Sequence, residues 1–85
     1  MALSAAGLER VRAVKARTED ALLALSGVVA VDIDELVVDA GPVWGIVVYV
    51  HPGATPSMRD RVPVSIEDVP TEVRELTVEL QGGMS

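Results

Sequence analysis

The longest apolar stretch of the chain spans residues 42–51 and predicts the central strand of a sheet. It consists almost entirely of β-branched and aromatic residues, which favour strands. A strand with one face in solvent alternates apolar and polar residues, but here both faces are apolar. One face carries Trp44, Ile46, Val48 and Val50, and the other carries Val43, Val47 and Tyr49. We therefore expect a strand that needs cover on both faces.

Residues 8–25 have the spacing of an amphipathic helix. The apolar positions recur every three or four residues and are Leu8, Val11, Val14, Thr18, Ala21, Leu22 and Leu25. Charged side chains occupy the rest of the circumference, and Gly27 suits the left-handed conformation that ends many helices. Residues 1–7 are expected to be a flexible end or a frayed first turn.

Residues 28–38 alternate apolar and acidic side chains as far as Glu35 and are then apolar on both faces. A bulge near Asp34 and Glu35 would reconcile the two halves. Residues 39–42 have turn chemistry. This strand and residues 43–50 are therefore predicted to form an antiparallel hairpin.

The last third of the chain predicts one short helix and one further strand. Thr55 followed by Pro56 is a suitable helix start, and Pro63 limits that helix to about residues 57–61. The later segments are predicted to be an extended segment or turn (residues 62–66), a strand (71–80) and a flexible tail (81–85).

The fold class predicted from this order is α+β. Residues 1–85 should form a single domain, in which the N-terminal helix packs on a small, mainly antiparallel sheet of three strands. One helix covers only one face of such a sheet. Either residues 52–70 cover the second face, or a second copy of the chain does. We expect self-association through that face or through an exposed edge strand.

Composition and charge argue against several classes of function. The 85 residues include no Cys, so there is no disulfide framework, thiolate metal site or cysteine nucleophile. The net charge of −6 argues against nucleic-acid binding, although four of the seven basic residues lie between Arg10 and Arg17. The sequence shows neither a signal peptide nor an apolar run that could span a membrane. We therefore expect a cytoplasmic protein without a membrane partner.

Candidate chemistry is sparse. Four carboxylates within eight residues, Asp32, Asp34, Glu35 and Asp39, could offer oxygen ligands to Ca²⁺ or Mg²⁺. They lack the Gly and the final Glu of an EF-hand loop and are more typical of a solvated strand face and a turn. His51, the sole imidazole, belongs to no recognisable catalytic pattern. We predict no catalytic residue, no cofactor and no metal site, and leave open whether these carboxylates hold a cation.

Five residues are candidates for contact with a protein partner: Trp44, Tyr49, His51, Arg10 and Arg17. Trp44 and Tyr49 should point to opposite faces of the central strand. Trp44 would pack under the helix, and Tyr49 is the better interface anchor. The helix cations could dock an acidic partner, although a solvated helix face is the commoner arrangement.

Three segments carry a family resemblance: residues 23–31 (LALSGVVAV), 46–50 (IVVYV) and 66–73 (IEDVPTEV). In this order they resemble the small α/β domain found beside bacterial trypsin-like serine peptidases, where a similar helix, hairpin and Gly-Val-Pro turn recur. The chain departs from that pattern at Asp68, where the family usually has Gly, and lacks its Gly-x-Gly after Val31. The resemblance implies an accessory module without enzymatic activity and carries over no catalytic residue.

Together these features predict a non-catalytic protein-interaction or accessory module that self-associates through its sheet. Two alternatives are a regulator of a peptidase-type partner and a small-ligand or divalent-metal binding subunit of an enzyme. In the second, the site would lie between protomers around His51 and the acidic strand. Nucleic-acid binding through the helix is a further alternative, and it predicts salt-sensitive retention on heparin.

Overall fold

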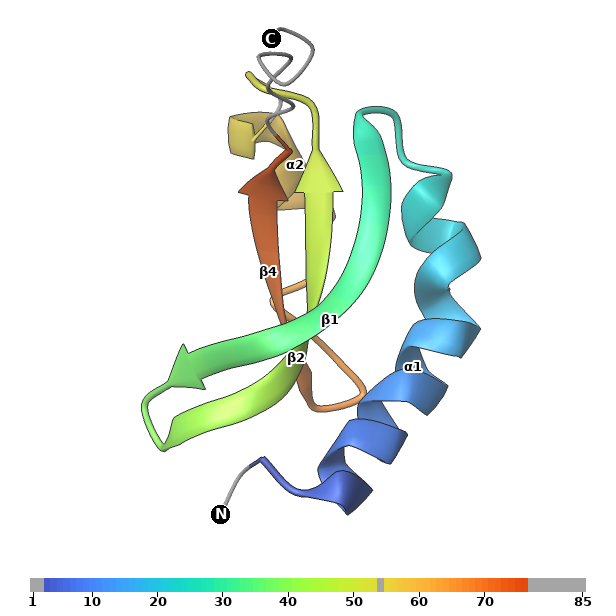
Figure 1. The fold of residues 1–85 in the computed structure, drawn as a ribbon. Helices are drawn as coiled ribbons and strands as arrows, with labels where there is room; N and C mark the ends of the chain where they lie inside the picture. The colour runs from blue at the N-terminus through green and yellow to red at the C-terminus, as the bar shows by residue number, and fades with distance from the viewer. Residues whose placement is uncertain (1–2, 54, 77–85) are drawn as a thin grey trace, which may run out of the picture.

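The computed structural model describes residues 3–53 and 55–76 (Figure 1). Its elements are α1 (Ala5–Leu23), β1 (Val28–Val38), β2 (Gly41–Val50), α2 (Thr55–Arg61), β3 (Ser65–Ile66) and β4 (Val69–Glu75). The predicted α+β class is confirmed. Neither helix in the described ranges has the length and apolar character to cross a membrane.

Helix α1 begins earlier than the apolar pattern predicts. The Ser4 hydroxyl accepts a hydrogen bond from the Gly7 backbone N at 2.9 Å. This N-cap satisfies a backbone donor that would otherwise lack a partner, so the helix starts at Ala5. Residues 3–7 are therefore ordered by the cap, and residues 1–2 lie outside the described ranges. The stripe buries Val11, Val14 and Leu22 as predicted, but the helix ends at Leu23 and not at Leu25.

The sheet has four strands in the order β1-β2-β4-β3. The predicted hairpin of β1 and β2 is confirmed, and two of the three strand pairings are antiparallel, but the sheet has four strands instead of the expected three, and β2 and β4 pair in parallel. The reason lies in residues 51–68, which are long enough to cross over and carry α2, as parallel neighbours require. Within that connection the ambiguous segment 62–66 supplies β3, which pairs with the start of β4.

The bulge expected near Asp34 and Glu35 is also wrong. The pairing of β1 with β2 runs without interruption from Ala30 opposite Tyr49 to Val38 opposite Gly41, and the irregularity lies between Val28 and Ala30. The strand stays regular although its second half is apolar on both faces. The predicted final strand ends at Glu75, and residues 77–80 of that prediction lie outside the described ranges.

Both helices pack against the same face of the sheet. Met58 and Val62, from α2 and the residue after it, join the core formed by Val11 and Val14 of α1 and by Ile46, Val48 and Val50 of β2. Residues 52–70 therefore do not cover the second face. Even so, Val47 and Leu36 on that face are only 0% and 4% exposed in the single chain. Val47 and Leu36 therefore offer another subunit little apolar surface to cover.

The turn between β3 and β4 is strained. Glu67 and Asp68 join Ile66 to Val69 and have φ values of 51° and 70°. Two-residue hairpin turns need this left-handed backbone, which glycine adopts more easily than a residue with a Cβ.

Substituting Asp68→Gly should raise the free energy of unfolding by about 1 kcal/mol because it removes that strain. In a domain of this size the melting temperature should rise by roughly 4–8 °C, measured by circular dichroism. Asp39→Gly is the matched control. Asp39 lies in the β1–β2 turn without a positive φ, so glycine there should lower stability. A lower melting temperature for Asp68→Gly would contradict the strain argument.

Candidate functional site

A hollow of about 470 Å³ lies where three parts of the chain meet. Arg10 contributes from α1, Val38, Val43 and Trp44 from the β1–β2 hairpin, and Ser65 and Asp68 from around the β3–β4 turn. Apolar side chains form most of its surface. Its size falls in the ~300–1,000 Å³ range typical of ligand pockets, so the hollow is large enough to accept side chains of a partner.

Exposed apolar side chains occur in the segments that line or adjoin this hollow. Among the described residues, Val64 and Val37 are the most exposed large hydrophobic residues, at 85% and 81%. Val64 directly precedes Ser65 but itself lines a second, smaller hollow of about 280 Å³ together with Val62 and Thr71. Val37 directly precedes Val38, which is itself exposed and lines the first hollow. Leu3, also exposed, precedes the first turn of α1. We call the hollow together with Leu3, Val37, Val38 and Val64 the hollow end.

Trp44 forms part of the wall of the hollow and packs against the core. Its indole Nε1 is the one buried side-chain nitrogen or oxygen of the described residues that has no hydrogen-bond partner. Buried Trp N–H groups usually have an acceptor, and an unpaired one costs free energy. One residue in the wall of the hollow therefore carries a buried N–H donor without a partner.

Arg10 and Arg17 hold one wall of the hollow in place. They lie seven positions apart, hence on one side of α1, and both reach Glu67 in the β3–β4 turn. Arg17 donates from Nη2 to Glu67 Oε1 at 2.5 Å and from Nε to Oε2 at 3.2 Å, while Arg10 donates to the Glu67 carbonyl oxygen. The hydrogen bond and charge of Arg17 lower the pKa of the Glu67 carboxyl. Arg10 and Arg17 were predicted to dock an acidic partner, but both form their hydrogen bonds with Glu67 of the same chain.

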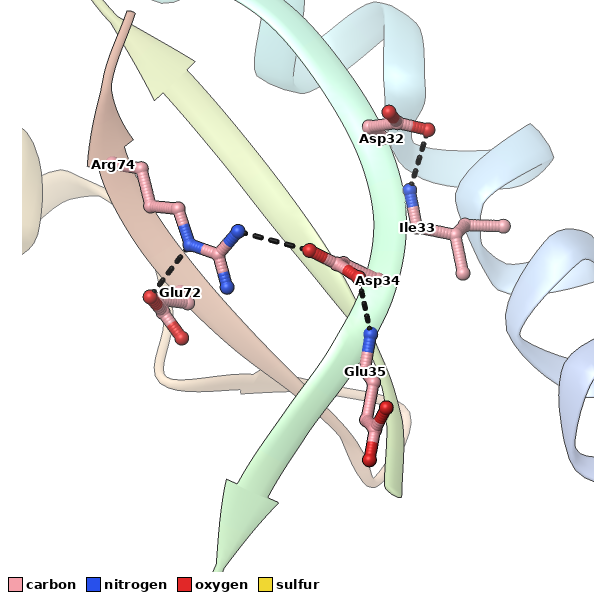
Figure 2. A network of polar contacts seen from close by, with 6 residues as sticks. All are labelled: Asp32, Ile33, Asp34, Glu35, Glu72 and Arg74. Atoms are coloured by element: carbon pink, nitrogen blue, oxygen red, sulfur yellow. Dashed lines mark hydrogen bonds and ion pairs between the residues drawn. The ribbon is translucent and has the colours of Figure 1, made fainter. Parts of the chain in front are cut away.

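The second sheet face carries a polar network that crosses three strands (Figure 2). Arg74 on β4 donates from Nε to Glu72 at 2.7 Å and from Nη1 to Asp34 Oδ2 on β1 at 3.0 Å. By register Asp34 is opposite Gly45, and Arg74 is beside Tyr49. The ion pair therefore spans β2 at Val47, which accounts for the burial of that residue.

Charge pairing sets the protonation of this network. The pKa of Arg74 is raised, chiefly by its hydrogen bonds to Glu72 and Asp34 and further by one to Tyr49. The pKa of Asp34 is lowered by its bonds to Arg74 and to the Glu35 backbone. Across the described ranges no group of three or more His, Cys, Asp or Glu side chains is arranged to hold a metal. Asp34 is instead neutralised by a guanidinium.

The structure separates the five predicted contact residues. Trp44 and Arg10 meet at the hollow, and Arg17 lies along the same side of α1. Tyr49 lies on the second face beside Arg74, and His51 is exposed at the end of β2, where its backbone N donates to Gly27 O at 3.0 Å.

Sequence reasoning missed the exposed valines of the hollow end. The available signal for Val37 and Val38 was the loss of alternation just before the β1–β2 turn, where apolar residues fall on both strand faces. For Val64 it was a valine directly after Pro63, outside a periodic segment.

Comparison with known proteins found no matching family model, no similar curated protein and no similar solved structure. The resemblance to the accessory domain of trypsin-like peptidases stays a prediction.

Proposed function

We propose that this protein is a non-catalytic interaction module and that its docking surface is the hollow end. The observation that supports this best is an apolar hollow lined by the exposed Val38, with further exposed apolar residues in the adjoining segments. Isolated exposed hydrophobic residues are ordinary on protein surfaces, whereas a contiguous group beside a concave site marks an interaction surface. Trp44, the residue with the unpaired indole N–H, also lines this hollow.

A second copy of the chain is the partner that the surface suits. Val37 and Val64 are exposed and directly precede two residues that line the hollow, Val38 and Ser65, so each copy carries both apolar groups and the cavity. A two-fold arrangement lets each copy fill the hollow of the other, which is the self-complementary geometry of most homodimers. Self-association was expected through the sheet face or an exposed edge strand; the buried Val47 and Leu36 argue against the sheet face, and we propose the hollow end instead.

Substituting Val64→Asp tests this proposal. Val64 is 85% exposed, so a charge there should leave the fold intact. In a two-fold dimer the change removes two valine contacts worth about 1.5 kcal/mol each. Sedimentation equilibrium should show an association constant lowered by roughly 100-fold.

Leu23→Asp is the matched control for that measurement. Leu23 is also an exposed apolar residue, but it lies at the far end of α1 and should leave association unchanged. Equal association constants for Val64→Asp and the unmodified protein would overturn the hollow end as the docking surface.

A further inference from the structure

Strand β1 forms one edge of the sheet and could pair with another strand. It is terminal in the strand order and eleven residues long, and it exposes Val29 and Val37. Long edge strands with exposed apolar side chains are templates for pairing between chains. The β1–β2 turn at residues 39–40 makes Val38 and Gly41 a hydrogen-bonded pair, so the even-numbered residues of β1 bond to β2. The odd-numbered residues direct their N–H and C=O groups outward.

Two of these outward amides are already occupied by the chain itself. The Ile33 backbone N donates to Asp32 Oδ1 at 2.8 Å, and the Glu35 backbone N donates to Asp34 Oδ1 at 2.7 Å (Figure 2). The other oxygen of Asp34 is held by Arg74 at 3.0 Å. The aspartates thus take the donors that an added strand would need, and Arg74 fixes the orientation of one of them.

We infer that Asp32 and Asp34 close the β1 edge against a second copy of this chain. The self-complementary register is an antiparallel pair of β1 strands centred on Ile33, because it places Val29 of each copy opposite Val37 of the other. The same register puts Asp32 opposite Asp34 of the second copy, twice, on the same face of the joined sheet. Directly opposed like charges destabilise strand pairing. The carboxylates therefore oppose pairing both by capping the amides and by repulsion.

This inference goes beyond the proposed function, because it concerns the β1 edge, which shares only Val37 with the hollow end. It assigns Asp32 and Asp34, which belong to no group of three or more metal-type ligands among the described residues, a role in preventing a further strand from pairing with β1. Natural edge strands are protected by charges in this way.

The double substitution D32A/D34A, made in the Val64→Asp background to remove docking at the hollow end, tests the inference. Without the two carboxylates the outward amides of β1 are free and the like charges are gone, so β1 should pair with β1 of a second copy. Sedimentation equilibrium should then show at least a tenfold higher association constant than for Val64→Asp alone. The matched control D20A/D60A also changes the net charge by two units, but away from β1, and should associate no more strongly.

Two further variants assign the cause. D32N/D34N keeps an oxygen acceptor and removes the charge, so it should associate more weakly than D32A/D34A. Adding Glu35→Pro to D32A/D34A removes an outward amide without breaking a bond to β2 and should return the protein to monomer. The inference is overturned if D32A/D34A remains monomeric while hydrogen exchange at Ile33 and Glu35 is as slow as in the unmodified chain. It is overturned equally if Glu35→Pro leaves the new association intact.

Discussion

Replacing Gly45 with valine should unfold most of the protein at temperatures where the unmodified chain is stable. Gly45 is buried in β2, and a Cβ there would lie 2.8 Å from Leu36 Cγ and 2.9 Å from the Pro70 carbonyl oxygen. Leu36 could shift, but Pro70 is backbone beside β2. Overpacking of this kind costs about 3 kcal/mol or more, a large part of the ~4–13 kcal/mol expected for a chain of this length.

The corresponding fall in melting temperature should exceed roughly 12 °C and is measured by circular dichroism. Gly53→Ala is the control, because a Cβ at Gly53 has nothing within 4 Å and meets only the strain of a φ of +88°. That strain should cost about 1 kcal/mol. If Gly45→Val and Gly53→Ala lowered the melting temperature equally, close packing would not be the reason why position 45 requires glycine.

Replacing Arg74 with alanine should expose Val47 and weaken the sheet. The Arg74 side chain spans β2 to reach Asp34, and Val47 lies beneath that span by register. Without the Arg74 side chain over Val47, the free energy of unfolding should fall by about 1–2 kcal/mol, as measured by urea denaturation. Arg12→Ala removes an exposed helix ion pair with Glu9 and should change stability by less than about 0.5 kcal/mol. An Arg74→Ala protein as stable as Arg12→Ala would contradict this explanation of Val47 burial.

The same variant should alter the response to acid. Arg74 lowers the pKa of Asp34 in the folded chain, so this pair stabilises the fold above the ordinary aspartate pKa of about 3.9. The contribution of the Arg74–Asp34 pair to stability is lost as the pH falls through the lowered pKa that Asp34 has in the folded chain. The stability difference between the unmodified protein and Arg74→Ala should therefore be full near neutral pH and shrink below about pH 4. A difference that grows on acidification would contradict the assignment.

Much of the fold follows from local sequence pattern. The helical period of residues 8–25 and the two-sided apolar run of 42–51 predict α1 and the buried β2, because each depends on side chains close in sequence. The parallel pairing of β4 does not follow from local pattern. It depends on how residues 51–68 cross the sheet, and only the length of that connection and its short helix hint at the result.

The candidate site was less predictable for a physical reason. Trp44 and Arg10 are far apart in sequence, and only the packing of α1 on the hairpin brings them to one hollow. The contact of Arg17 with Glu67 likewise joins residues fifty positions apart. Exposure of Val37 and Val64 cannot be read from residue type, because a valine is as suited to a core as to an interface.

The most direct test of the central claim is a concentration series of the unmodified protein followed by sedimentation equilibrium and by Trp44 fluorescence. Trp44 is the sole tryptophan and lines the hollow, so its emission reports docking there without a label. Docking of a second copy predicts a rise from monomer to dimer mass across the micromolar range, with a blue shift of Trp44 emission over the same concentrations. A protein that stays monomeric throughout, with constant Trp44 emission, would contradict self-association through the hollow end.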